Sequence, residues 1–120
     1  MVPLPDCASG EWGPAKSARL FGLIPVTHPE AIINCEQYCE IRFKMTKPLS
    51  EFLVILHKNC YDSRHLQRCC QVTTRSDEVL ISLEFPDEGQ YGLDIYTRDP
   101  NQSKNMVTHC CKYLINARVD

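Results

Sequence analysis

The segment Pro86-Asp-Glu-Gly-Gln-Tyr-Gly-Leu93 decides the fold of this chain. It lies between two segments in which apolar and polar residues alternate, as they do in half-buried strands. The pattern Asp-x-Gly-x-Tyr at such a junction is typical of a tyrosine corner, where a tyrosine near the start of a strand bonds back to the backbone of the preceding turn. We therefore predict structural roles for Asp87, Gly89 and Tyr91. A β-turn followed by a core tyrosine is the second interpretation, and it also predicts an all-β domain.

The same alternation continues on both sides of this corner. Residues 39–45 show it most clearly, and residues 79–85 repeat it. Residues 52–56 are apolar on both faces, but their length and their β-branched and aromatic content favour a strand. Further strands are expected at residues 19–26 with a continuation at 31–34, at 90–97 and at 106–116, and a weaker strand is expected at 66–74. About seven strands separated by turns predict an immunoglobulin-like antiparallel β-sandwich, with a barrel as the alternative.

The domain is expected to occupy residues 19–118, after an irregular leader of residues 1–18. Proline and glycine interrupt any regular pattern in the leader, although its Trp12 is expected to pack on the domain that follows. Pro25 cannot donate a ladder hydrogen bond, so the first strand should lie at an edge or break there. The corner lacks two features of antibody domains, since Leu93 replaces the cysteine two residues after the tyrosine and residues 52–56 contain no tryptophan.

Charge and hydropathy exclude two classes of partner. The 120 residues carry a formal net charge of -2, and the basic residues are scattered, so we expect no nucleic-acid binding. No stretch approaches the ~20 apolar residues that span a bilayer, and the first residues do not form a signal peptide. We therefore also expect no membrane partner.

The eight cysteines are the unusual feature of the composition. An even number is compatible with disulfides in a secreted domain. However, the adjacent pairs Cys69-Cys70 and Cys110-Cys111 lie in segments expected to be strands, where neighbouring side chains point to opposite faces. We expect each pair to place one thiol inside and one outside, and we favour reduced cysteines that act as small apolar residues.

The cysteines and histidines are the candidates for a catalytic or metal site. A metal site is the sharper alternative, since Cys35-x3-Cys39 and His109 next to Cys110 offer soft ligands, but a structural zinc site normally pairs two tight clusters. His28, His57 and His65 are expected at the surface, and His109 is expected to face the core. We predict no catalytic residue, no metal site and no cofactor.

Three segments carry a family resemblance. Phe21-Gly-Leu-Ile-Pro-Val-Thr-His28, Glu88-Gly-Gln-Tyr-Gly-Leu-Asp-Ile-Tyr96 and Lys112-Tyr-Leu-Ile115 occur in this order over about residues 19–117. Together they resemble the immunoglobulin-like repeats of the kyphoscoliosis peptidase and hillarin family. The resemblance implies an intracellular, cytoskeleton-associated protein in which a transglutaminase-like domain precedes this one. It also implies that the family's catalytic Cys, His and Asp lie in that other domain, since we find no matching segment here.

The resulting prediction is a non-catalytic protein-interaction or structural-support module of a larger cytoplasmic, cytoskeleton-associated protein. Its partner would be another protein or the neighbouring transglutaminase-like domain. The alternative is a secreted, disulfide-bonded sandwich that acts as a ligand or adhesion module. Leu80 and Tyr96 fall opposite the core sets of their strands, so they would form a docking patch if they shared one sheet. The edge strand at residues 20–26 could instead add a partner's strand, within the limit set by Pro25.

Overall fold

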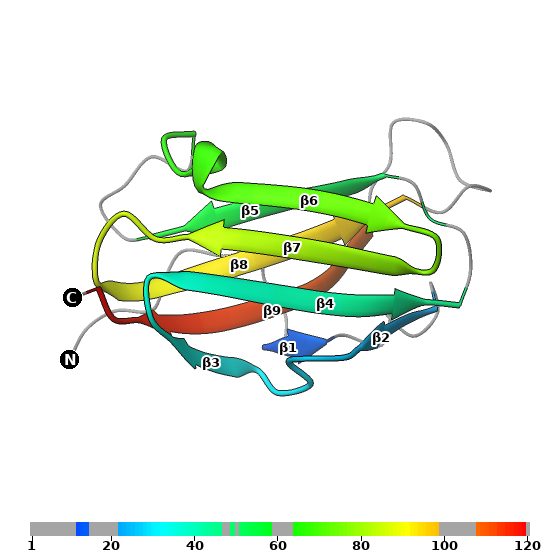
Figure 1. Ribbon diagram of the computed structural model, residues 1–120, viewed down its shortest axis with the longest axis horizontal. Helices are drawn as coiled ribbons and strands as arrows, with labels where there is room; N and C mark the ends of the chain where they lie inside the picture. Colours follow the sequence, from blue (N-terminus) through cyan, green and yellow to red (C-terminus); the bar gives the residue numbers. More distant parts are fainter. Residues whose placement is uncertain are drawn as a thin grey trace.

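The computed structural model describes residues 12–14, 22–46, 49, 51–58, 64–98 and 108–119, which form two β-sheets packed face to face (Figure 1). The elements in chain order are β1 (Gly13–Pro14), β2 (Leu23–Pro25), β3 (Ile32–Cys35), β4 (Tyr38–Met45), β5 (Phe52–His57), the 3-10 helix η1 (Gln67–Cys69), β6 (Cys70–Arg75), β7 (Glu78–Glu84), β8 (Gly89–Thr97) and β9 (Thr108–Ala117). Within the described part of the chain, no helix is long and apolar enough to cross a membrane.

The strand order identifies the sandwich. One sheet has the order β2-β4-β7-β6, and the other has the order β1-β9-β8-β5 with β3 also paired to β9. These sets match the ABED and CFG sheets of an immunoglobulin domain, with β8 as strand F after the corner. The predicted immunoglobulin-like sandwich is therefore confirmed, and the barrel alternative is wrong because the strands form two separate sheets.

The first predicted strand is divided between the two sheets. β2 runs antiparallel to β4 and ends at Pro25, as expected for a residue that cannot donate to the ladder. The chain then crosses over, and β3 pairs in parallel with β9, from Ile32 opposite Leu114 to Cys35 opposite Ala117. The Tyr113 hydroxyl donates to the carbonyl of His28 at 2.5 Å and so holds the crossover against β9.

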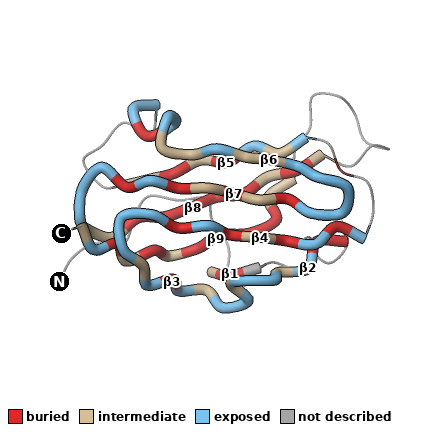
Figure 2. The backbone as a smooth tube through the Cα atoms, in the orientation of Figure 1, coloured by how far each residue is buried: buried red, intermediate tan, exposed pale blue. Residues whose placement is uncertain are grey.

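The core lies between the sheets and follows the predicted alternation. Buried positions alternate with more exposed ones along β4 and β7, whereas residues 91–95 of β8 and 110–113 of β9 are all buried (Figure 2). Two aromatic pairs bridge the layers, with ring centroids 4.8 Å apart for Phe85–Tyr91 and 6.4 Å apart for Phe43–Tyr113. The largest fully buried side chains are Tyr91, Tyr113, Phe43, Phe85, Ile41, Leu56, Leu66, Ile81, Leu83, Leu93, Ile95 and Ile115.

Two segments differ from the prediction. Residues 66–74 were expected to be one strand, but Leu66 precedes the single turn η1 and β6 begins only at Cys70. In β9 the register shifts so that Ile95 pairs with Cys111 and Tyr96 pairs with His109, which leaves Cys110 as the extra residue of a β-bulge. Both changes break the two-residue period on which the cysteine prediction depended.

The predicted leader and domain boundary are described only in part. Gly13 and Pro14 pair with Lys112 and Cys111 of β9, so this short piece of residues 1–18 joins the sheet. The ring of Trp12 lies against the domain as expected, with its centroid 4.4 Å from the Lys112 Nζ. The rest of residues 1–18, Met106 and Val107 lie outside the described residues.

Candidate functional site

The corner residues Asp87, Gly89 and Tyr91 meet at the start of β8. The Tyr91 hydroxyl donates to the carbonyl of Asp87 at 2.7 Å and accepts from the N–H of the same residue at 3.3 Å. The Tyr91 side chain is fully buried, so its ring fills the core while its hydroxyl holds the turn. This geometry is that of a tyrosine corner.

Gly89 gives the corner room for a lysine. Its φ is +149°, and a Cβ added there would lie 3.1 Å from Cε of Lys58. The Lys58 ammonium donates to the carbonyl of Glu88 at 3.1 Å and lies 4.9 Å from the centroid of the Tyr91 ring. A side chain at position 89 would therefore displace a lysine that covers the corner.

A buried carboxylate lies on the outer side of the β5–β8–β9 sheet. Asp94 of β8 is only 1% exposed, although its neighbours Leu93 and Ile95 point to the core. Its Oδ2 accepts from Nε2 of His57 on β5 at 3.0 Å, and its Oδ1 accepts from Nε2 of His109 on β9 at 2.7 Å. Three adjacent strands are thus joined by side chains as well as by the backbone ladder.

Sequence reasoning missed this cluster. His57 was expected at the surface and His109 in the core, but both lie on the outer face with their side chains 22% exposed. The usable signal was an aspartate at an outward position of a strand that is otherwise apolar, because a charge there requires a partner when it becomes buried. The sequence spacing of the two histidines could not identify the cluster, because Asp94 and the two histidines lie on three different strands.

The cluster resembles the orienting half of a catalytic triad, in which an aspartate holds a histidine. The thiols nearest to His109 in sequence do not complete it. Burial raises the pKa of Cys110 and of Cys111 to about 12, whereas a nucleophilic cysteine needs a lowered pKa. Among the described residues, no group of three or more Cys, His, Asp and Glu side chains is arranged to hold a metal ion.

The cysteine pairs do not divide between inside and outside, so that prediction is wrong. Cys110 and Cys111 are both buried, because the bulge in β9 breaks the alternation. Cys69 and Cys70 are both half-buried, because one ends η1 and the other begins β6. All six described cysteines are free thiols, while Cys7 and Cys60 lie outside the described residues.

The buried thiols are expected to resist alkylation. Burial raises the pKa of Cys39, Cys70, Cys110 and Cys111 to about 12, so at pH 8 they hold far less thiolate than an exposed cysteine. With iodoacetamide on the folded protein, Cys39, Cys110 and Cys111 should react at least about tenfold more slowly than the half-exposed Cys69. Peptide mass spectrometry over a time course measures these rates, with the urea-unfolded chain as the control. Equal rates in the folded protein would contradict the burial of these thiols.

The outer β5–β8–β9 face also carries accessible apolar side chains on β5 and β8. Leu53 is 41% exposed and pairs in register with the half-buried Tyr96, and Ile55 is the next outward residue of β5. The Tyr96 ring meets the His109 ring edge-on, with 5.1 Å between centroids. We call Leu53, Ile55 and Tyr96 the apolar platform. It borders the Asp94 cluster, so the face combines a rigid polar centre with an apolar margin.

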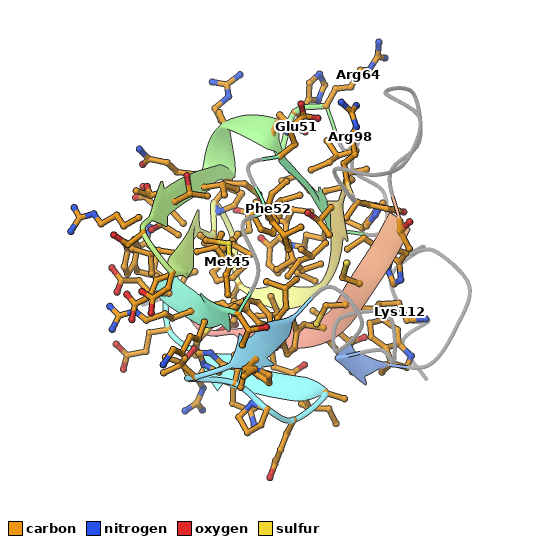
Figure 3. The ribbon with its side chains drawn as sticks, turned by 90° about the vertical axis from the view of Figure 1, so that its right-hand side faces the viewer. Met45, Glu51, Phe52, Arg64, Arg98 and Lys112 are labelled. Carbon is orange, nitrogen blue, oxygen red and sulfur yellow. The ribbon has the colours of Figure 1, made fainter. Side chains whose placement is uncertain are left out.

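Charged side chains lie at two margins of this face. Arg98 donates to Glu51 at 2.6 Å at the end where β5 begins (Figure 3). Lys112 lies beside β1, where it is 5% exposed and lies over the ring of Trp12 (Figure 3). Leu80, the other expected docking residue, lies on the outer side of the opposite sheet. Leu80 and Tyr96 therefore do not form one patch.

The comparisons with known proteins agree with this architecture. A family model described as "KY-like, immunoglobulin-like domain" matches residues 20–119. Over 121 residues the chain is 62% identical to the Lim and transglutaminase domain protein ltd-1 of Caenorhabditis elegans, covering 98% of the chain and 17% of that protein. Over 134 residues it is 46% identical to Hillarin of Drosophila melanogaster, covering 98% of the chain and 16% of that protein. The chain thus spans about a sixth of the length of each relative.

Among solved structures, the chain is similar to a chimeric titin Z1Z2 with an inserted decorin peptide. The TM-score is 0.41 and the sequence identity is 10%, with 82% of this chain and 90% of that chain covered.

Proposed function

Because this chain belongs to the family of KY-like, immunoglobulin-like domains, we propose that it is a non-catalytic interaction and support module of a larger intracellular, cytoskeleton-associated protein. The surface that performs this role is the outer β5–β8–β9 face. Its partner is the transglutaminase-like domain of the same protein.

The observation that carries the proposal is the apolar platform. One face of an antiparallel sheet is commonly solvated and polar. Here Leu53 is 41% exposed, and it lies beside Tyr96 and Ile55 around a carboxylate that is 1% exposed. Protein interfaces place aromatic and aliphatic anchors at their centre and charged groups at the rim. Here the apolar side chains of β5 and β8 are flanked by the Arg98–Glu51 ion pair at the end where β5 begins.

The choice of partner rests on the relatives. The name of ltd-1 includes a transglutaminase domain, and the matching region is 17% of that protein. A module of this size next to a larger domain can pack against it through one sheet face, as domains within one chain commonly do. We extend this arrangement to the present chain.

The chemistry of the thiols supports the non-catalytic and intracellular parts of the proposal. The six described cysteines are free, and those in the core have a raised pKa. Free buried thiols are typical of reducing compartments, whereas secreted domains of this size commonly use cysteine for disulfides. A raised thiol pKa also disfavours nucleophilic catalysis.

The test is a charge placed on the platform. Leu53→Glu should leave the fold intact, because the side chain is exposed, and should weaken binding to the separately expressed transglutaminase domain of ltd-1 about tenfold or more. Isothermal titration calorimetry measures the affinity, and amide shifts of the 15N-labelled chain should change at β5 and β8.

Ile24→Glu is the matched control. Ile24 is 49% exposed but belongs to β2 of the other sheet, so the same charge there should leave the affinity unchanged. The proposal fails if neither variant changes binding, or if the amide shifts map to the β2–β4–β7–β6 face.

A further inference from the structure

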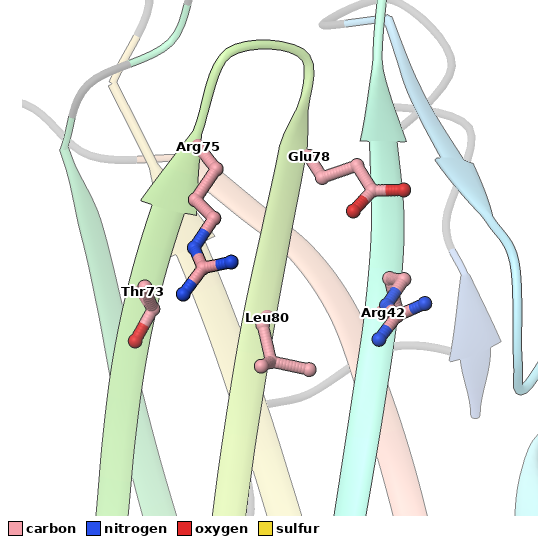
Figure 4. Close-up of a pocket in the computed structure, with 5 residues that line it drawn as sticks. All are labelled: Arg42, Thr73, Arg75, Glu78 and Leu80. Carbon is pink, nitrogen blue, oxygen red and sulfur yellow. The ribbon is translucent and has the colours of Figure 1, made fainter.

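A shallow pocket opens on the other side of the sandwich, on the outer face of β4, β7 and β6. Its volume is about 110 Å³, and it is lined by Arg42, Thr73, Arg75, Glu78 and Leu80 (Figure 4). We call it the two-arginine pocket. It lies on the opposite sheet from the apolar platform, so both surfaces are accessible at the same time.

The strand register builds the pocket. Leu80 of β7 pairs with Arg42 of β4 on one side and with Thr73 of β6 on the other, so these three side chains form one row across the sheet. Arg75, Glu78 and Lys44 of β4 form the next row, at the β6–β7 hairpin. In Figure 4 the Arg75 guanidinium reaches toward β7 above Leu80, and Arg42 stands on β4 on the other side of Leu80, so the leucine lies between the two arginines.

Neither guanidinium is neutralised by a nearby carboxylate. Among the described residues, neither Arg42 nor Arg75 takes part in an ion pair. Glu78 faces the pocket but lies beyond ion-pair distance of both. Exposed surface arginines are common, but two unpaired ones around a half-buried leucine form a site with charge, planar donors and an apolar floor.

We propose that the two-arginine pocket binds a carboxylate side chain from an extended acidic segment of a partner protein. Each guanidinium presents a planar fork of donors that matches a carboxylate, and the Thr73 hydroxyl adds a further donor at the rim. Leu80 would contact the methylene groups of a glutamate. Glu78 favours this singly charged ligand over a doubly charged phosphate group, because its carboxylate repels the second negative charge.

This inference goes beyond the proposed function because it uses the opposite sheet. With one face packed on the neighbouring domain, the other face would hold an acidic segment of a separate protein. The module would then connect the two. Because the surfaces share no residue, either assignment can fail without the other.

The test is a titration of the 15N-labelled chain with three peptides that differ at one position. The probes are acetyl-Gly-Ser-Leu-X-Leu-Ser-Gly-amide with X as glutamate, glutamine or phosphoserine. The glutamate peptide should shift the amides of Arg42, Thr73 and Leu80, and it should bind about tenfold more tightly than the glutamine peptide at low salt.

Variants assign the binding to the pocket. Arg42→Gln and Arg75→Gln should each weaken binding of the glutamate peptide about tenfold, whereas Glu78→Gln should strengthen it a few-fold. Arg68→Gln on η1 is the control, because Arg68 is an exposed arginine outside the pocket and its loss should change nothing. Unfolding midpoints of all variants verify that each remains folded.

Three results would overturn the proposal. The first is equal binding of the glutamate and glutamine peptides, and the second is binding that survives both Arg42→Gln and Arg75→Gln. The third is a preference of more than tenfold for the phosphoserine peptide, which would assign the pocket to phosphorylated segments instead.

Discussion

Replacing Asp94 with alanine is expected to lower the free energy of unfolding by about 3 kcal/mol. The carboxylate is 1% exposed and accepts hydrogen bonds from His57 and His109, which lie on the two neighbouring strands. Its removal leaves both Nε2 donors without their acceptor in a site that water reaches poorly. The loss of stability should exceed that caused by removing one partner of a surface ion pair, because the Asp94 carboxylate is fully desolvated.

Urea denaturation followed by circular dichroism measures this change. Asp77→Ala in the exposed β6–β7 turn is the matched control and should change the free energy by less than about 0.5 kcal/mol. Asp94→Asn should fall between the two, because it keeps one acceptor oxygen and turns an amide donor toward the other histidine. A loss below 1 kcal/mol for Asp94→Ala would mean that the cluster contributes little to the sheet.

Replacing Tyr91 with alanine is expected to lower the free energy of unfolding by about 4 kcal/mol, and replacing it with phenylalanine by about 1 kcal/mol. The alanine variant loses a fully buried ring whose centroid lies 4.8 Å from the centroid of the Phe85 ring. The phenylalanine variant keeps this ring and loses only the hydrogen bonds of the hydroxyl with Asp87. The difference between the two variants therefore separates the packing contribution from the contribution of the corner.

Tyr38 supplies the control for both substitutions. It also stands in a strand and its hydroxyl also donates, to Glu40 at 3.0 Å, but its side chain is 54% exposed. Tyr38→Ala and Tyr38→Phe should each change the stability by less than about 0.5 kcal/mol. If Tyr91→Phe is equally neutral, the corner hydrogen bonds contribute nothing to stability, and the second interpretation of the motif holds.

The fold could be predicted from the sequence where one face of a strand is buried and the other is solvated. Residues 39–45 show this most clearly, because Ile41 and Phe43 are fully buried while Glu40 and Lys44 are exposed. The predicted break at Pro25 was equally direct, since it follows from the missing N–H of proline. Both signals are local, so a single sequence contains all the information they need.

The parts that failed depend on neighbouring strands. The bulge at Cys110 is a property of the β8–β9 pairing, and it has no marker in the sequence of β9 alone. The Asp94 cluster requires residues from three strands to meet, and their order in the sheet is not readable from spacing. The two-arginine pocket has the same origin, because Arg42 and Arg75 lie on strands separated by β7.

The parallel pairing of β3 with β9 has a mechanical consequence. β3 enters this sheet from the N-terminal side of the domain, and β9 leads to its C-terminal side, so tension along the chain pulls the two strands in opposite directions past each other. The antiparallel β1 could be peeled from β9 one residue at a time, but the β3–β9 bonds, from Ile32 to Cys35, are loaded together in shear. The resistance of the domain to stretching would therefore be concentrated in this short parallel ladder, at the edge of the sheet opposite β5.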